Sequence, residues 1–148
     1  MPWDDLQKKR ESITNQIYFI TFNTKNREPQ FEAHKAASIF CQQIKINETQ
    51  MHCKWITWVL MPDHFHGLVQ IQDKKLQRVM SDLKGRTAYA LNKQLERQGA
   101  FWQKQYYEHT IRKDEDIKEI ARYIVANPLR KKLVQNIKEY PYWNSDYL

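Results

Sequence analysis

The sequence predicts an α+β fold: a ferredoxin-like βαββαβ arrangement with an antiparallel sheet and one additional C-terminal helix. Segments rich in aromatic and β-branched residues alternate with longer segments whose apolar residues recur every three or four positions. Glycine and proline number only 3 and 5 among 148 residues, whereas aromatic residues make up 13%, so disorder is disfavoured. We expect a single domain over residues 1–148, with an N-terminal extension over about 1–15 and a C-terminal tail over about 135–148.

The first elements can be assigned in order along the chain. Residues 16–22 are dominated by aromatic and β-branched side chains, which favour a first strand. Over residues 31–47, the apolar residues follow the spacing of one helix face. Residues 54–61 and 64–71 indicate two further strands, joined by a tight turn that begins at Pro62.

The rest of the chain continues with a helix, a strand and a final helix. Residues 76–98 carry apolar side chains on one side, which predicts a long helix ending at Gly99. Residues 105–112 form the fourth predicted strand. The last helix begins with acidic residues at 114–116, which suit the positive end of a helix dipole, and Pro128 is expected to stop it.

This order of elements gives each face of the sheet a different role. The first two helices of a ferredoxin-like fold cover one face, and the other face is free to receive the last helix and a functional site. Because side chains alternate between faces along a strand, His64 and His66 project together onto the open face. Phe65, Val69 and Ile71 are then expected to face the core.

His64 and His66 are candidate ligands of a metal ion. Two imidazoles about 7 Å apart along one sheet face can bind one divalent ion, but open coordination needs a further protein ligand. Asn127 could supply an oxygen, which favours Mg²⁺ or Mn²⁺ over zinc because these ions prefer oxygen and keep positions free for phosphate. The alternative is that the two histidines are a hydrogen-bonded polar pair on a strand.

Tyr123 is the candidate nucleophile. It lies one helical turn before Asn127, so a helix packed over the open sheet face can bring the phenol and the amide to the histidines together. A tyrosine with its ordinary pKa near 10 is a weak nucleophile, so it requires a metal-polarised phosphate or a nearby base. The alternative is that Tyr123 packs at the edge of the core with its hydroxyl in water.

The charge of the chain favours a polyanionic partner, because the net charge is +7 and the pI is near 9.4. Basic side chains could hold backbone phosphates, and an aromatic ring could stack on an unpaired base. The candidates for these DNA contacts are Lys84, Arg86, Trp102, Arg112, Arg122 and Arg130. For single basic residues the alternative is a solvated helix face. His109 is a candidate general base or leaving-group acid, although a structural hydrogen bond is an equally good interpretation.

The sequence also bears on the cellular compartment. Cys41 and Cys53 are isolated thiols without C-x-x-C spacing, which indicates packing residues in a reducing environment. The first residues lack the basic and apolar stretches of a secretion signal. No apolar run reaches the roughly 18 residues that a membrane span requires. We therefore expect a cytoplasmic protein without membrane contacts.

Three blocks of the sequence resemble those of the REP-associated tyrosine transposases, relatives of the single-tyrosine HUH transposases. The resemblance extends over nearly the whole chain. The blocks are Met61-Pro62-Asp63-His64-Phe65-His66, then Phe101-Trp102-Gln103 with Tyr106-Tyr107-Glu108-His109 and Ile111-Arg112, and finally Tyr123-Ile124-Val125-Ala126-Asn127-Pro128-Leu129-Arg130. One departure is Glu108, since family members more often carry Asp at this position.

This resemblance implies a metal-dependent endonuclease and strand transferase that acts on single-stranded DNA, often beside a palindromic hairpin. It implies that Tyr123 is the nucleophile, forming a 5′-phosphotyrosine link and releasing a 3′-hydroxyl. It also implies that His64 and His66 bind the metal and that Asn127 occupies the position of a third, amide ligand. Religation would need no ATP, because the phosphotyrosine stores the energy of the broken bond.

Two other functions fit the same residues. A non-catalytic module on a ferredoxin-like sheet would bind nucleic acid through aromatic and arginine side chains, independently of metal. A metal-dependent hydrolase would release free ends through activated water and form no covalent protein–DNA species. The sequence also leaves open a monomer or a homodimer, and the DNA sequence recognised, because phosphate contacts carry little base information.

Overall fold

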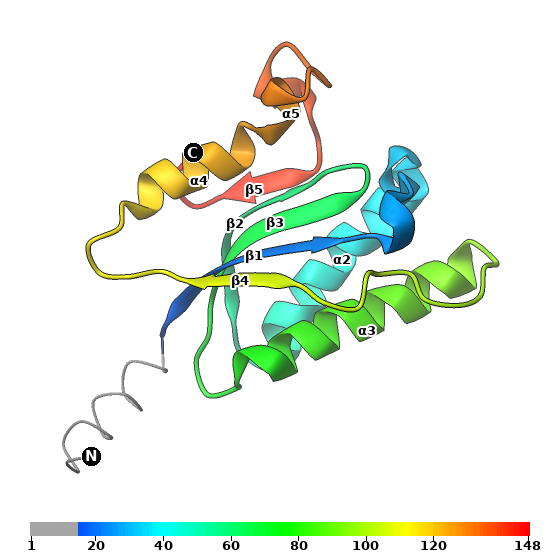
Figure 1. Ribbon diagram of the computed structural model, residues 1–148, viewed down its shortest axis with the longest axis horizontal. Helices are drawn as coiled ribbons and strands as arrows, with labels where there is room; N and C mark the ends of the chain where they lie inside the picture. Colours follow the sequence, from blue (N-terminus) through cyan, green and yellow to red (C-terminus); the bar gives the residue numbers. More distant parts are fainter. Residues whose placement is uncertain (1–14) are drawn as a thin grey trace.

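The computed structural model describes residues 15–148, so the N-terminal extension expected over residues 1–15 lies, except for Asn15, outside the described residues. Five strands form one antiparallel sheet in the order β4-β1-β3-β2-β5 (Figure 1). The strands are β1 (Ile17–Asn23), β2 (Lys54–Leu60), β3 (His64–Gln70), β4 (Tyr107–Thr110) and β5 (Trp143–Ser145). Strands β1 to β4 have the order of a ferredoxin-like sheet, which confirms the predicted fold class.

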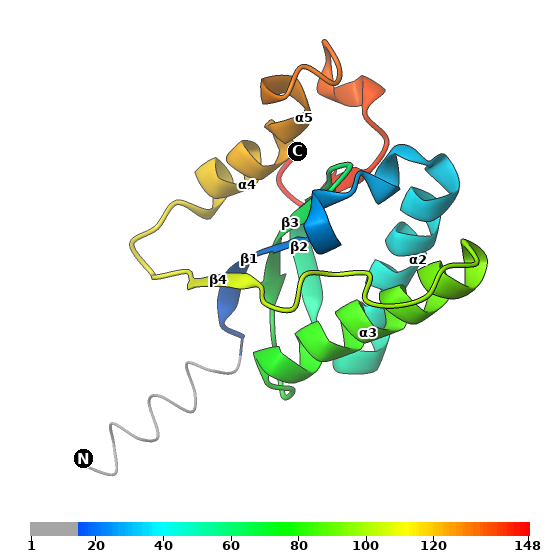
Figure 2. The same cartoon turned by 45° about the vertical axis from the view of Figure 1, so that its right-hand side comes forward.

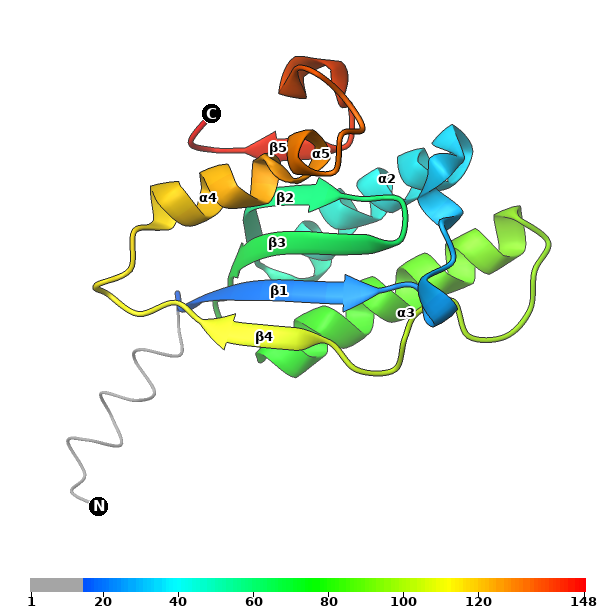
Figure 3. The same ribbon diagram turned by 45° about the horizontal axis from the view of Figure 1, so that its top comes forward.

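Helices lie on both faces of this sheet (Figure 2). On one face lie α2 (His34–Met51) and α3 (Leu76–Gln94), and on the other lies α4 (Ile117–Val125), followed by α5 (Asn127–Arg130) (Figure 3). Three short 3₁₀ turns complete the described elements: η1 (Lys25–Arg27), η2 (Gln30–Glu32) and η3 (Ile137–Glu139). Among the helices described, none combines the length and the apolar character needed to cross a membrane.

Each face of the sheet packs into its own apolar core. The main core lies between the sheet and helices α2 and α3, and it contains Phe65, Val69 and Ile71, as the alternation of strand residues predicts. Leu68, on the opposite face of β3, packs against Ile124 of α4 in a second, smaller core. His64 and His66 lie on the same face of β3 as Leu68. The packing of α4 on this face therefore determines which side chains lie next to the two imidazoles.

Gly67 on β3 is a position where the main core leaves no room for a side chain. A Cβ atom at this residue would lie 2.8 Å from ring atoms of Trp55 and 2.9 Å from a ring atom of Phe65. Both rings are buried, so neither can move without disturbing its neighbours. We therefore expect Gly67→Ala to lower the free energy of unfolding by about 1–3 kcal/mol. Urea denaturation of the full chain measures this change.

The control for this measurement is Gly85→Ala on α3. A Cβ atom at residue 85 meets no group of the described chain within 4 Å outside its own helix backbone. Alanine also favours a helix over glycine by roughly 0.5–1 kcal/mol, so this variant should be as stable as the original chain or more so. If both variants unfold at the same urea concentration, the packing argument for Gly67 is wrong.

The last predicted helix is divided in the structure. It ends at Val125, and α5 begins at Asn127 with Pro128 in its first turn, so Pro128 does not stop the helical path as predicted. Proline is tolerated there because the N–H groups of a first turn have no helical partner. In a continuous helix the backbone N–H of residue 128 would bond to the carbonyl of Ile124, but Pro128 has no N–H to donate. The side-chain Nδ2 of Asn127 donates to that oxygen instead, at 2.9 Å.

Strand β5 is the one element of the sheet that the sequence does not predict. It lies within the expected C-terminal tail and pairs with β2, where the hydroxyls of Thr57 and Ser145 are 2.8 Å apart. Its three residues are too few for a period to be recognised. The two largest boundary differences are in the helices. The second element predicted over residues 31–47 is α2 at His34–Met51, and α3 ends at Gln94, before Gly99, because Glu96 adopts a positive φ of 52°.

Candidate active site

A cleft of about 470 Å³ opens on the face of the sheet that carries α4. Among the predicted site residues, five line this cleft together: His64, His66, Tyr123, Asn127 and Arg130. The other lining residues are Thr21, Asn23, Arg27 and Lys131. Strands β1 and β3 therefore meet the junction of α4 and α5 at one place, which collects the predicted metal ligands and nucleophile.

The two histidines are neighbours on β3. In the ladder between β1 and β3, His64 pairs with Asn23 and His66 pairs with Thr21. The centroids of the two imidazole rings are 4.7 Å apart. Phe65, between them in sequence, is fully buried in the main core, so the alternation of the strand places both rings in the cleft.

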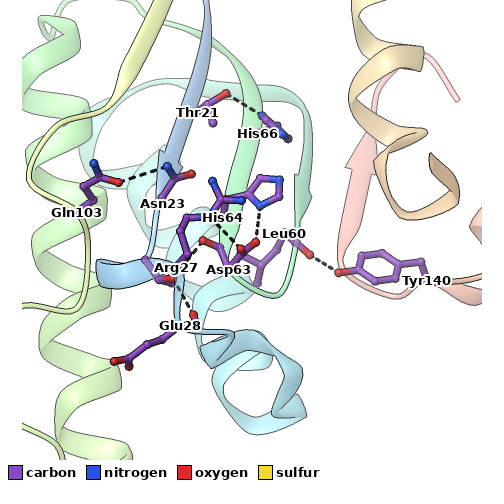
Figure 4. Close-up of polar contacts among 11 residues, drawn as sticks. Thr21, Asn23, Arg27, Glu28, Leu60, Asp63, His64, His66, Gln103 and Tyr140 are labelled. Atoms are coloured by element: carbon purple, nitrogen blue, oxygen red, sulfur yellow. Dashed lines mark hydrogen bonds and ion pairs between the residues drawn. The ribbon is translucent and has the colours of Figure 1, made fainter. Parts of the chain in front are cut away.

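Each imidazole is held through its Nδ1 atom (Figure 4). His64 Nδ1 lies 2.6 Å from Asp63 Oδ1, and His66 Nδ1 lies 2.7 Å from Thr21 Oγ1. The Oδ2 atom of Asp63 accepts a further hydrogen bond from Arg27 Nε at 2.9 Å. Within residues 15–148 these bonds leave the Nε2 atom of each ring available. In metal sites, a hydrogen bond at one ring nitrogen commonly orients a histidine whose other nitrogen binds the metal.

Both imidazoles are neutral at pH 7. Burial lowers the pKa of His64, although the adjacent Asp63 carboxylate opposes this effect. Burial is also the main reason that the pKa of His66 falls to about 3, with added repulsion from His64, Arg130 and Arg27. Neutral imidazole is the form that binds a metal ion, so the environment of the cleft keeps both rings in the ligating state.

Asn127 completes a candidate ligand set. It is only 5% exposed, and its Nδ2 atom is engaged by the Ile124 carbonyl, which leaves Oδ1 as the side-chain atom for a ligand. Nowhere in the described chain do three His, Cys, Asp or Glu side chains come together as a metal site, so a third protein ligand in this cleft would be the amide. Two imidazole nitrogens and one amide oxygen fit a divalent ion with open positions better than a closed structural zinc site.

Tyr123 lines the cleft from α4. Its side chain is well exposed, at 58%, and the guanidinium carbon of Arg130 lies 4.0 Å from the centre of its ring. This distance is that of a close cation–π contact. The contact holds the ring beside a positive charge while the phenol stays accessible. The Tyr123 ring and the Arg130 guanidinium therefore border the cleft together.

Three of the predicted DNA contacts lie away from the cleft. Lys84 and Arg86 belong to α3, on the opposite face of the sheet. Lys84 Nζ donates to the Gln103 carbonyl at 2.9 Å, and Arg86 pairs with Asp82 at 2.9 Å. Trp102 is only 7% exposed and belongs to the main core. The ring of Trp102 therefore packs in the main core and not in the cleft, and its Nε1 donates to Thr87 Oγ1 at 3.0 Å.

The remaining predicted residues are Arg112, Arg122 and His109, none of which lines the cleft. Arg122 lines a neighbouring groove between α4 and the sheet. Arg112 is exposed, and its Nε atom is 3.6 Å from Glu115 Oε1. His109 Nε2 lies 3.0 Å from the same carboxylate oxygen. This bond is the structural role that was one of the two interpretations of His109.

Besides Asn23 and Lys131, which line the cleft, the structure adds Thr21, Arg27 and Asp63, which contact the two histidines directly or through Asp63. Asp63 directly precedes His64, and this adjacency is a signal that the sequence does contain. For Thr21 and Arg27 the sequence holds no such signal. Pairing of β1 with β3 brings Thr21 to His66, and the turn η1 after β1 brings Arg27 to Asp63.

Comparisons with known proteins bear on the family and the fold of the chain. Residues 12–127 match the family model described as "Transposase IS200 like". A protein of Haemophilus influenzae named for the REP-associated tyrosine transposases is 26% identical, over 90% of this chain and 82% of the relative. The REP-associated tyrosine transposase of Escherichia coli K12 is 23% identical, over 90% of this chain and 79% of the relative. Among solved structures, a REP-associated tyrosine transposase bound to a REP hairpin shares the fold, with a TM-score of 0.76 and 21% identity over 88% of this chain and 77% of that one.

Proposed function

Because the chain belongs to the family of IS200-like transposases, we propose that it cuts and rejoins single-stranded DNA beside a palindromic hairpin through a covalent tyrosine intermediate. The family membership and the relatives confirm the resemblance predicted from the sequence blocks. The observation that carries the proposal is the single cleft in which His64, His66, Asn127 and Tyr123 meet. A hairpin substrate is supported by the relative of the same fold that is bound to a REP hairpin.

Tyr123 is the nucleophile in this proposal. Its hydroxyl oxygen attacks a backbone phosphorus, and the bond from phosphorus to the 3′ oxygen breaks as the new bond forms. The upstream strand leaves with a 3′-hydroxyl, which takes up a proton in place of the one lost by the phenol. The downstream strand stays attached through its 5′-phosphate. In religation a 3′-hydroxyl attacks the phosphotyrosine, and no ATP is required because one phosphodiester replaces another.

The residues around the nucleophile bind and orient the phosphate. His64, His66 and Asn127 would hold a divalent ion, which we propose is Mg²⁺ or Mn²⁺. When bound, such an ion would neutralise negative charge on the phosphate and help to orient it for attack. Arg27 and Arg130 also line the cleft and add positive charge on the protein side. Each can donate paired hydrogen bonds to phosphate oxygens.

The experiment that tests this proposal is a denaturing gel of the chain with 3′-labelled hairpin DNA. The DNA comes from palindromes that flank the gene, and each reaction is run with Mg²⁺, with Mn²⁺ and with a chelator. A 3′ label is needed because the proposed link retains the downstream strand. The expected result is a metal-dependent label at the mass of the protein.

The same gel separates the competing functions. Cleavage without a labelled protein band would show hydrolysis by water, because only attack by the protein retains the downstream strand. Binding that persists in chelator, with no cleavage of any flanking hairpin, would show a non-catalytic binding module. Either result would overturn the proposed transesterification.

The contact between Asp63 and His64 provides a separate test of the metal site. Asp63→Asn removes the charge that orients the His64 ring through Nδ1, and also weakens the bond to Arg27. We expect the affinity for Mn²⁺ to fall by about 10- to 100-fold, as is usual when such a partner of a metal-binding histidine is lost. Titration calorimetry of the DNA-free chain measures this affinity without relying on cleavage.

A matched control exists elsewhere in the chain. Asp73 also contacts a histidine Nδ1, that of His52, at 3.4 Å, but both side chains are exposed and neither lines the cleft. Asp73→Asn should bind Mn²⁺ as the original chain does. If Asp63→Asn also binds Mn²⁺ unchanged, then Asp63 does not position a metal ligand.

A further inference from the structure

A second groove, of about 740 Å³, lies on the same face of the sheet as the cleft. It is lined by α4 on one side and by β1 and the end of β4 on the other. We call it the side groove, and its apolar lining includes Phe19, Ile111, Ile120 and Ala126. The proposed function assigns no role to this groove.

Tyr123 connects the two sites, because its side chain lines both the cleft and the side groove. When its hydroxyl attacks a phosphate, the nucleotides on either side of that phosphate must lie next to the ring. The base of one of these nucleotides can then reach the side groove. The side groove is thus continuous with the site where the DNA is held.

The lining of the side groove suits a base better than a phosphate. Aromatic and aliphatic side chains bind the faces of bases by stacking and apolar contact. The ring of Phe19 is fixed in place, stacked on His66 at 5.9 Å and met edge-on by Tyr107 at 6.2 Å. Two carboxylates, those of Glu115 and Glu119, line the groove beside one guanidinium, that of Arg122, so the groove lacks the excess of positive charge that holds a backbone phosphate. The groove therefore selects an uncharged part of the strand.

The two carboxylates differ in the partners they already have. Glu115 accepts hydrogen bonds from His109 Nε2 at 3.0 Å and from the backbone N–H of Arg112 at 2.9 Å. Glu119 is exposed on α4, and no side chain within residues 15–148 pairs with its carboxylate. A free carboxylate accepts hydrogen bonds from the exocyclic amino groups of cytosine, adenine and guanine, whereas thymine presents carbonyl oxygens flanking its ring N–H.

We propose that the side groove binds one unpaired base next to the attacked phosphate, and that Glu119 favours a base with an exocyclic amino group over thymine. This inference rests on the proposed function, because it takes Tyr123 as the nucleophile. It gives the chain a subsite that reads a base, in addition to phosphate contacts that carry no sequence information.

The first test measures binding in the Tyr123→Phe variant, which keeps the ring and lacks the attacking hydroxyl. The probes are fluorescent hairpin strands in which each unpaired flanking nucleotide is replaced in turn by an abasic site. Fluorescence anisotropy should show one position at which the abasic site weakens binding by about 5- to 100-fold, the usual effect of losing one stacked base. Equal affinity for all abasic strands would overturn the proposal.

The second test concerns Glu119. At the sensitive position, a strand with cytosine should bind about 10-fold more tightly than one with thymine. Glu119→Gln should remove this preference, because the glutamine amide can donate to thymine O4 as readily as it accepts from cytosine N4. The control is Glu96→Gln, which makes the same charge change beyond the end of α3, on the opposite face, and should keep the preference. A preference that survives Glu119→Gln would refute the role of this carboxylate.

The failure of this inference can be told apart from the failure of the proposed function. The covalent adduct of the unvaried chain with an intact strand, together with its loss in Tyr123→Phe, reports on the nucleophile and not on the subsite. An adduct without any abasic effect overturns the subsite and leaves the proposed function standing. An abasic effect at one position without an adduct supports the subsite and overturns the nucleophile. A change in solution mass on Glu119→Gln, with no base preference at any position, would instead mark the groove as a contact between copies of the chain and overturn the subsite.

Discussion

Tyr123→Phe is expected to abolish the covalent protein–DNA adduct and to lower strand cleavage by about 10³-fold or more, as loss of a catalytic nucleophile generally does. The substitution removes one hydroxyl and keeps the ring on which the Arg130 guanidinium rests, 4.0 Å from its centre. Because the side chain is exposed, the fold should be unaffected. The denaturing gel with 3′-labelled hairpin DNA measures both the adduct and the cut strand.

The matched control for this substitution is Tyr89→Phe. Tyr89 is also exposed, at 71%, but it stands on α3, on the opposite face of the sheet. This variant should form the adduct at the rate of the original chain. If Tyr123→Phe still yields a labelled protein, another residue attacks the phosphate, and the assignment of the nucleophile is wrong.

His66→Ala is expected to remove the response of the chain to divalent metal. Cleavage should fall by about 10²- to 10³-fold, since the stabilisation of phosphate charge by a metal is worth several kcal/mol. In the original chain, Mn²⁺ at 100 times its dissociation constant should stabilise the fold by about 2.7 kcal/mol. In His66→Ala this stabilisation should be lost. Thermal unfolding with and without Mn²⁺ measures it independently of DNA.

Two controls accompany the His66 variant. Its imidazole is largely buried and bonded to Thr21, so the unfolding temperature without metal is recorded first, and only the shift caused by Mn²⁺ is compared. His34→Ala removes a histidine at the start of α2, outside the cleft, and should retain the full shift. A full Mn²⁺ shift in His66→Ala would show that this ring is not a ligand.

Local sequence features were sufficient to predict the framework of the site. The period of two in β3 depends only on strand geometry, so the shared face of His64 and His66 could be predicted without any knowledge of neighbouring elements. The same reasoning places Phe65 in the core, as the structure confirms. The order of strands and helices likewise follows from periodicity and turn residues, because each of these signals acts over a few positions.

The environment of the ligands depends on contacts between segments far apart in sequence. Pairing of β1 with β3 places Thr21 against His66, and the turn after β1 places Arg27 against Asp63. Sequence periodicity does not predict such contacts, because they depend on the register between β1 and β3 and on the path of the turn after β1. The same limit applies to β5, which is formed only because β2 offers an edge for pairing.

What the sequence by itself determined is the fold class, the direction of the two histidines, and the nearness of Tyr123 to Asn127 along one helical path. Only the tertiary structure decided which basic residues reach the cleft: Arg130 does, whereas Lys84 and Arg86 stand on the opposite face and Trp102 is packed in the core. The physical reason is that sequence periodicity predicts only which face of its own helix or strand a side chain occupies. Which other element lies against that face depends on how the helices and strands pack against one another.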